Sequence, residues 1–186
     1  MIAVVVIVVV VVLAVVAFAG LYNGLVTRRN RVDQAWSDIG VQLERRHDLI
    51  PNLVETVKGY AEHERQTFEA VVAARNAAVE AQKGKGPADL AKAEDALSGA
   101  LGRLFALAEA YPDLKANQNF LALQEELTAT EGRVAYARQF YNDSVLGYNN
   151  RIQSFPAVIL ANMLKSTRRD HFETDAASRD VPKVQF

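Results

Sequence analysis

The fold is decided by residues 32–57, which read VDQAWSDIGVQLERRHDLIPNLVETV. Apolar side chains recur there at alternating spacings of three and four, which is the period of one face of an α-helix. The members of this stripe are Val32, Trp36, Ile39, Leu43, Ile50, Leu53, Val57 and, just beyond the quoted stretch, Tyr60. Arg46 fills the one polar step. The pattern predicts an amphipathic helix that runs to about Val79, with a kink or a tight restart at Pro51.

Two further helices are expected after this one. The segment Gly84-Lys85-Gly86-Pro87 breaks the first helix, and Pro87 suits the first turn of the next. The second helix carries a stripe of Leu90, Leu97, Leu101, Leu104 and Ala108 and stops near Tyr111-Pro112-Asp113. The third runs from about Asn117 to Phe155, with Phe120, Leu123, Leu127, Val134, Ala137, Tyr141, Val145, Tyr148 and Ile152 on its stripe. Phe155-Pro156 ends or bends it, and residues 157–164 form a short apolar continuation.

The N-terminal residues predict a membrane span. Residues 2–21 read IAVVVIVVVVVLAVVAFAGL, and twenty residues in a helix rise about 30 Å, the hydrocarbon thickness of a bilayer. Ten of them are valines, which disfavour a helix in water, but in lipid a single span must satisfy its own backbone hydrogen bonds. A cleaved secretory signal would need a basic segment before a shorter apolar core. We therefore expect a retained anchor.

The flanking charges predict the direction of this span. Arg28, Arg29 and Arg31 follow it before the first acid, Asp33, and no basic side chain precedes it. The positive-inside rule then places the N-terminus outside and the remainder of the chain in the cytoplasm.

The predicted fold class is all-α: an N-terminal single transmembrane helix followed by an elongated antiparallel three-to-four-helix bundle, because long amphipathic helices joined by short breaks bury their stripes on one another. No window alternates apolar and polar residues as a strand would, so no strands are expected. The expected divisions are residues 1–22 as the anchor, 23–165 as the bundle and 166–186 as an irregular C-terminal tail.

Composition excludes several functional classes. The 186 residues carry 21 Lys+Arg and 22 Asp+Glu, a net charge of −1, without the basic excess of a nucleic-acid-binding protein. There is no cysteine, which excludes a disulfide framework, a thiolate metal site and a lipid-anchor cysteine.

The chain resembles the LemA family of bacterial membrane-anchored helical proteins along essentially its whole length. The resemblance rests on Tyr22-Asn23, on residues 32–39 (VDQAWSDI), on residues 41–54 (VQLERRHDLIPNLV), on Tyr141-Asn142, Tyr148-Asn149 and Phe155-Pro156, and on Val181-Pro182-Lys183-Val184. Many relatives carry a lipid-anchor cysteine just before the Tyr-Asn pair, where this sequence has Gly20-Leu21. The resemblance implies a three-to-four-helix bundle without established catalytic residues, in the inner membrane of a bacterial cell. It also implies a scaffold or adaptor, because genes of the family often neighbour those of membrane proteases and envelope-stress functions.

Metal and cofactor chemistry have little support. His63-Glu64 begins a helical zinc-protease signature, but Thr67 stands where the second histidine is required. His47, His63 and His171 are far apart in the sequence. We therefore predict no metal, no cofactor and no catalytic site, and expect His63 on a solvated helix face.

Six residues form a candidate interaction surface: Trp36, Arg46, Tyr141, Asn142, Tyr148 and Asn149. Each has a plainer reading. Trp36 on an apolar stripe is usually core packing, and the Tyr-Asn pairs, seven apart on one face, can link helices within the chain as well as between subunits. Arg46 either extends its stem to water or pairs with an acid of another helix or subunit, within a run at 44–48 that otherwise reads as a wet helix surface. Arg168 and Arg169 suit either anionic lipid headgroups or a solvated turn.

These patterns favour a non-enzymatic, membrane-anchored scaffold or adaptor that self-associates through its helical bundle. The alternative is an accessory regulatory subunit of a membrane metalloprotease or envelope-stress system. The expected partners are the lipid bilayer, further copies of the chain and another membrane protein such as a protease, and no nucleic acid.

Overall fold

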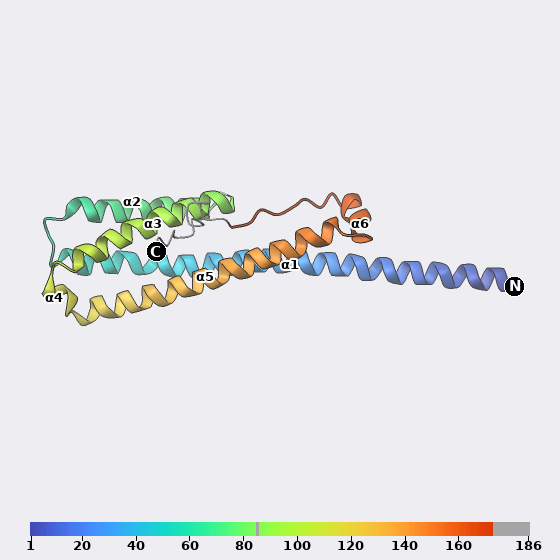
Figure 1. Cartoon of the computed structure of the whole chain (residues 1–186), viewed down its shortest axis with the longest axis horizontal. Coiled ribbons are helices and arrows are strands. Elements are labelled where there is room, and N and C mark those ends of the chain that lie inside the picture. The colour runs from blue at the N-terminus through green and yellow to red at the C-terminus, as the bar shows by residue number, and fades with distance from the viewer. Residues whose placement is uncertain (85, 173–186) are drawn as a thin grey trace, which may run out of the picture. The chain divides into compact units, whose positions relative to one another are not determined.

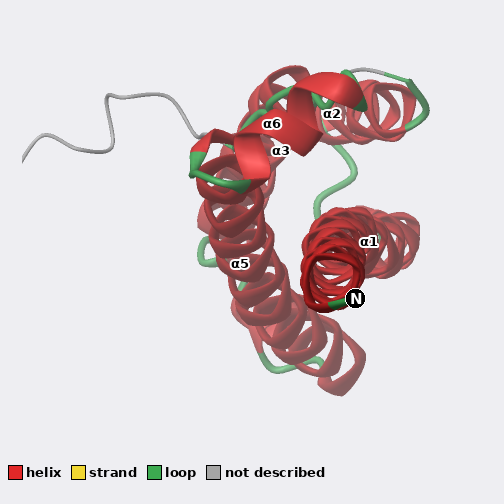
Figure 2. Ribbon diagram, turned by 90° about the vertical axis from the view of Figure 1, so that its right-hand side faces the viewer, coloured by secondary structure: helices red, strands yellow, loops and turns green. Residues whose placement is uncertain are grey.

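The computed structural model describes residues 1–84 and 86–172, and in these residues every regular element is an α-helix. Figure 2 shows helices and loops only. The helices are α1 (Ile2–Lys58), α2 (Arg65–Gln82), α3 (Pro87–Ala108), α4 (Pro112–Lys115), α5 (Gln118–Gln153) and α6 (Ala157–Met163). The predicted all-α fold is confirmed. Residues 166–172 of the expected tail are not helical; its remainder, with Val181-Pro182-Lys183-Val184, lies outside the described residues.

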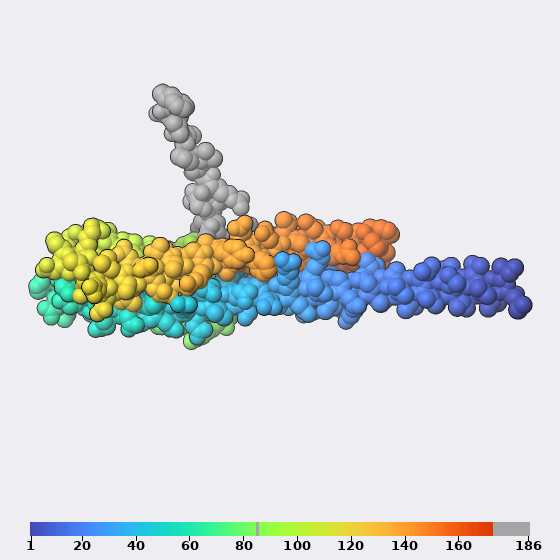
Figure 3. All heavy atoms as spheres, turned by 90° about the horizontal axis from the view of Figure 1, so that it is seen from below, coloured from blue at the N-terminus to red at the C-terminus, as the bar shows by residue number. Residues whose placement is uncertain are grey.

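The first helix contains the predicted span. α1 has 57 residues, and its N-terminal apolar part is the one stretch of the described chain whose length and composition suit a membrane crossing. None of this stretch is buried against the protein, and Figure 3 shows the blue N-terminal part of α1 uncovered on the viewed face.

The first helix ends earlier than the sequence predicted. Pro51 lies inside α1, and the helix neither stops nor restarts there; the break comes at residues 59–64, between α1 and α2. The carbonyl of His47, which a residue other than proline at position 51 would engage, instead accepts a hydrogen bond from Nε of Arg75 at 3.3 Å. Gly59, which weakens a helix, begins the turn instead.

The chain divides into two compact units, each described by itself. The larger, here the bundle unit, contains residues 38–139 with 171–172. The chain reverses between α1 and α2, between α2 and α3 and around α4, so that α1, α2, α3 and α5 contribute four antiparallel segments (Figure 1). Their stripes meet in one core, which includes Ile50, Leu53, Val57, Phe68, Val71, Leu97, Leu101, Leu104, Phe120 and Leu127.

The other unit, here the juxtamembrane unit, contains residues 1–37 and 140–170. In it α5 runs antiparallel to α1. Nη1 of Arg28 donates to the carbonyl of Gly147 at 3.3 Å, and a Cβ on Gly24 would lie 3.9 Å from Nη2 of Arg151. The two pairs, 28 with 147 and 24 with 151, share one antiparallel register, because a step of four residues toward the N-terminus of α1 matches a step of four residues toward the C-terminus of α5. The buried residues of this unit include Leu25, Val32, Tyr141, Val145, Tyr148 and Ile152.

Candidate functional site

Arg46, His47 and Glu94 are buried together in the interior of the bundle unit, and Ser98 and Glu131 join them from exposed positions. These five residues are here called the buried charge cluster. Arg46 is placed inward because it occupies a stripe position of α1, and it is 2% exposed. Its Nη1 donates to Oε2 of Glu94 at 2.8 Å, while its Nη2 donates to Oγ of Ser98 at 2.8 Å and to Oε1 of Glu131 at 3.0 Å. Of the two alternatives for Arg46, pairing with an acid of another helix is what the structure contains.

The carboxylate of Glu94 has a second partner. Its Oε1 lies 2.7 Å from Nε2 of His47, and the two side chains are 0% and 2% exposed. Glu94 therefore joins two consecutive residues of α1 to α3, and Glu131, whose side chain is 50% exposed, adds α5. Burying ionisable groups is costly unless they are paired, and in this cluster the pairing links α1, α3 and α5.

The prediction of a wet surface at residues 44–48 is confirmed for Glu44, Arg45 and Asp48, which are exposed, but it is wrong for His47. α1 is buried at 43, 46, 47 and 50, which widens the inward face by one residue at this turn. Glu94 was not singled out from the sequence either. The sequence does contain an indication of it: Leu90 and Leu97 are seven residues apart, and position 94 is the place between them where the helical period requires an inward-facing residue.

A surface depression of about 340 Å³ opens beside this cluster. Arg46, Ser98, Glu131 and Arg138 are among its lining residues. Burial lowers the pKa of the Arg138 guanidinium below its ordinary value, an effect that Glu94 and Asp95 oppose and Arg46 reinforces. This guanidinium lies over the ring of Phe172, 4.6 Å from the centroid. The depression has cationic and anionic groups side by side, so it does not present a field of one sign.

The Tyr-Asn pairs lie in the juxtamembrane unit, where they hold the segment that follows α6. The Tyr141 hydroxyl donates to the carbonyl of Asp170 at 2.9 Å. The amide of Asn149 makes two bonds with the backbone of Arg169: its Nδ2 donates to the carbonyl at 2.8 Å, and its Oδ1 accepts from the backbone N–H at 2.9 Å. Nη2 of Arg169 donates to Oδ1 of Asp33 at 2.9 Å. The segment is thus fixed to both α5 and α1.

The structure also places the other members of the candidate interaction surface. Trp36 is half-buried, and its ring lies 5.3 Å from the ring of Tyr141, centroid to centroid, at 53°. Tyr148 and Asn149 are buried, and Asn142 is half-buried. Arg46 belongs to the bundle unit and the other five to the juxtamembrane unit. Most of this set therefore makes contacts within the chain, and a role between subunits stays a prediction.

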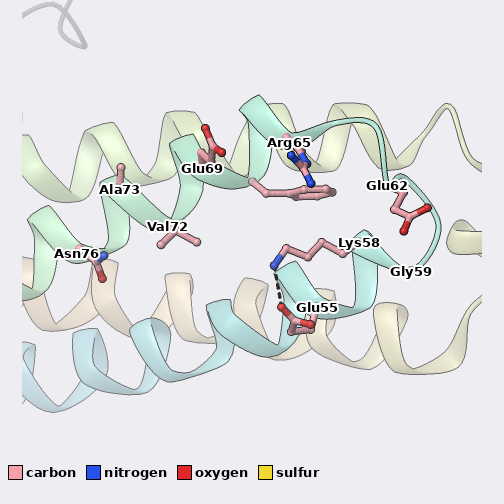
Figure 4. A pocket seen from close by; sticks show the side chains of 10 residues that line it. Glu55, Lys58, Gly59, Glu62, Arg65, Glu69, Val72, Ala73 and Asn76 are labelled. Atoms are coloured by element: carbon pink, nitrogen blue, oxygen red, sulfur yellow. Dashed lines mark hydrogen bonds and ion pairs between the residues drawn. The ribbon is translucent and has the colours of Figure 1, made fainter.

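Figure 4 shows an open groove in the bundle unit, between the end of α1 and the start of α2. It holds about 800 Å³ and is lined by Glu55, Lys58, Gly59, Glu62, Arg65, Phe68, Glu69, Val72, Ala73 and Asn76. Nζ of Lys58 donates to Oε1 of Glu55 at 2.9 Å across its rim. The groove has an apolar contribution from Phe68 and Val72 within a rim that carries both charges.

Metal-ligating groups do not converge in the described part of the chain, where no three His, Asp or Glu side chains could hold an ion together. His63 is exposed, as predicted, but it lies in the turn between α1 and α2 rather than on a helix face. The absence of a metal or cofactor from the working protein stays a prediction.

Comparisons with known proteins place this arrangement among relatives. The model of the LemA family matches residues 35–186. The magnetosome protein MamQ 2 of Paramagnetospirillum magneticum is 29% identical over 186 residues, covering 88% of this chain and 68% of the relative. The magnetosome protein MamQ of Magnetospirillum gryphiswaldense is 28% identical over 187 residues, with the same coverage. The protein LemA of Metamycoplasma hominis is 27% identical over 139 residues, covering 74% of this chain and 62% of the relative.

Proposed function

Because the chain belongs to the LemA family, we propose that it is a non-enzymatic, membrane-anchored scaffold that self-associates and positions other membrane proteins. The observation that carries this proposal is α1, in which an apolar span and the first helix of the bundle are one uninterrupted element. A helix with this construction presents a folded domain directly at the membrane surface.

The interior polar groups support binding rather than catalysis. In the buried charge cluster both carboxylate oxygens of Glu94 pair with Arg46 and His47, and Glu94 and His47 are almost inaccessible to solvent. A general acid or base must be within hydrogen-bond reach of a substrate. These groups therefore serve the pairing of helices, and the surface that remains for a partner is the outside of the helices and the groove beside Phe68.

Self-association is supported by confinement in a membrane. The exposed apolar side chains of the bundle unit are single and scattered, as at Val41, Val72, Leu121 and Tyr136, so a strong interface in dilute solution is not expected. Anchoring in two dimensions raises the local concentration of copies, and weak lateral contacts then add up.

The mass of the full-length protein extracted in mild detergent tests the proposal, together with Ala19→Cys as a cross-linking reporter in the span, which is clean because the chain has no other cysteine. We expect disulfide-linked dimers in membranes and, in concentrated mild detergent, a homo-oligomer that dissociates on dilution because its lateral contacts are weak without the membrane. A monomer that gives no cross-link, and that gains mass only when a membrane protease co-purifies, would contradict self-association and favour the accessory regulatory subunit.

A further inference from the structure

The short helix α6 carries an apolar face that the protein leaves uncovered. Ile159 and Met163 are spaced by four on α6, so they lie along one side of it, and Phe155 lies in the turn just before the helix. The three residues are 57%, 69% and 80% exposed. The opposite side, made of Ala157, Leu160 and Ala161, is buried in the juxtamembrane unit. Leu164, which follows directly, is 47% exposed. An exposed apolar face of this kind on a helix packed through its other side needs an occupant.

The register of α5 on α1 determines the height of α6. Arg28 meets Gly147, and Gly24 meets Arg151, with α5 running back toward the N-terminus of α1. Continued by two residues, the same register brings the end of α5 at Gln153 opposite Tyr22, the first residue after the apolar stretch at 2–21. Figure 1 agrees, since α6 lies at the level of the end of that stretch. The uncovered face is therefore level with the boundary between hydrocarbon and water.

The charges around α6 have the sign that this boundary attracts. Outside the apolar stretch, the juxtamembrane unit contains seven Arg and Lys against three Asp, although the whole chain has a net charge of −1. Arg151, Lys165 and Arg168 lie within a few residues of the helix in sequence, and Arg28 and Arg31 line a cavity of about 440 Å³ between α1 and α5. Apolar residues next to a basic cluster are the composition of helices that lie in the interface of anionic membranes.

From this geometry we infer that α6 is a second membrane contact: Phe155, Ile159 and Met163 insert into the interface of the same bilayer that the span anchors, and the basic residues around them select anionic headgroups. The inference rests on the anchoring in the proposed function and adds a second point of attachment. Two attachments restrict the rotation of the juxtamembrane unit about its span, which a single helix does not.

The test uses the full chain, one copy per lipid nanodisc, with an environment-sensitive fluorophore on a single introduced cysteine. Ile159→Cys is the reporter. Gln34→Cys is the control in the same unit, exposed and about 20 Å along α1 beyond Leu21. In discs of phosphatidylethanolamine with 30% phosphatidylglycerol, we expect the label at 159 to emit at shorter wavelength and to be quenched several-fold more by spin-labelled lipid than the label at 34. Lowering the phosphatidylglycerol to zero should reduce that difference at least twofold.

Three results would overturn the inference. Equal quenching of the two labels by aqueous iodide would place α6 in water. Shielding of position 159 in crowded proteoliposomes but not in single-copy discs would mean that a second copy covers the face. In a third measurement the label is placed at Met163→Cys and Ile159→Asp is added to the same chain. If the label at 163 stays as shielded as it is without Ile159→Asp, the face does not insert as a unit. Ile159→Asp should leave the helical circular dichroism unchanged, because Ile159 is 57% exposed and lies outside the buried side of α6.

Flotation with vesicles separates this inference from the proposed function. A full chain that floats while its label at 159 stays in water retains its anchor and lacks only the second contact. A full chain that does not float has lost the anchoring as well.

Discussion

At the scale of single residues, the carboxylate of Glu94 is expected to be the most sensitive charge in the bundle unit. Glu94→Gln keeps the shape but leaves Arg46 with only the half-exposed Glu131 as a counter-charge. Breaking a buried pair from one side costs about 3 kcal/mol, which corresponds to a fall of roughly 10 °C in Tm for a chain of this size. The measurement is thermal unfolding followed by circular dichroism.

The matched control is Glu126→Gln, which removes an acid on α5 that pairs with Arg45 at the surface. Because that pair is largely exposed, its loss should shift Tm by no more than about 2 °C. Equal shifts for the two variants would contradict the claim that burial makes Glu94 important.

Tyr141 gives the protein a pH dependence on the alkaline side. Burial raises the pKa of its phenol above the ordinary 10.0, Arg169 opposes the shift, and Asp170 and Asp33 reinforce it. Above pH 10 the unfolded chain therefore loses this proton before the folded chain does, so stability that is present below pH 10 is lost as the pH rises through the folded pKa.

Tyr141→Phe removes this titration together with the hydrogen bond to Asp170. At pH 8 we expect it to cost about 1 kcal/mol. Between pH 9 and pH 11 the free energy of unfolding should fall less for the variant than for the parent chain, measured by denaturant titration at each pH. An identical fall would assign the alkaline loss to other groups.

The sequence predicts a buried charged residue where that residue interrupts an apolar stripe. Arg46 stood out because one polar residue interrupted an apolar series, and its pairing was one of two readings. Glu94 leaves the same kind of interruption in the next helix, and two interruptions of opposite charge in neighbouring stripes predict a pair. His47 could not be found in this way, because it lies beside the stripe and is buried only because α1 is covered over a wider arc at that turn.

At the scale of elements, Arg75 of α2 is expected to compensate for the proline inside α1. Its Nε donates to the His47 carbonyl that Pro51 leaves without a partner in the helix. Arg75→Met should therefore cost about 1–2 kcal/mol, the penalty for an unsatisfied carbonyl with limited access to water. Pro51→Ala restores the donor within the helix and should raise stability by about 1 kcal/mol or more.

The decisive measurement is the double-mutant cycle. In the Pro51→Ala background the carbonyl has its own donor, so Arg75→Met should cost less by at least about 0.5 kcal/mol. Strict additivity of the two changes would mean that Arg75 does not act through this carbonyl.

Pro51 and Gly59 explain why the first break was not predicted at its true place. A proline inside a stripe and a glycine after it are both helix-ending signals, and the sequence does not say which is compensated from outside. The donor that compensates Pro51 is Arg75, 24 residues further along the chain. It lies on α2 and reaches the carbonyl of His47 because the chain turns back at 59–64. The stripes themselves were predicted well, because burial at Val32, Ile39, Leu43, Ile50, Leu53 and Val57 follows the helical period alone.

At the scale of the whole molecule, charge and apolar surface are distributed along the chain in a way that predicts its topology. No Asp, Glu, Lys, Arg or His precedes Arg28, and Arg28, Arg29 and Arg31 follow the apolar stretch together. The basic excess of the juxtamembrane unit has its counterpart in an acidic excess elsewhere in the sequence. Basic residues beside a span are retained on the cytoplasmic side, so we expect the N-terminus outside the inner membrane and the bundle unit inside.

Two single-cysteine variants test this topology, because the parent chain has none. Lys92→Cys lies on an exposed position of α3, and Ile2→Cys lies at the start of the span, 84% exposed in the protein. In cells with only the outer barrier permeabilised, a membrane-impermeant thiol reagent should label Ile2→Cys and spare Lys92→Cys. Opening the inner membrane should then expose Lys92→Cys, which separates a protected site from an unreactive one. Labelling of Lys92→Cys before that step would place the bundle unit outside, and the arginines after the span would then have to be explained by lipid contact alone.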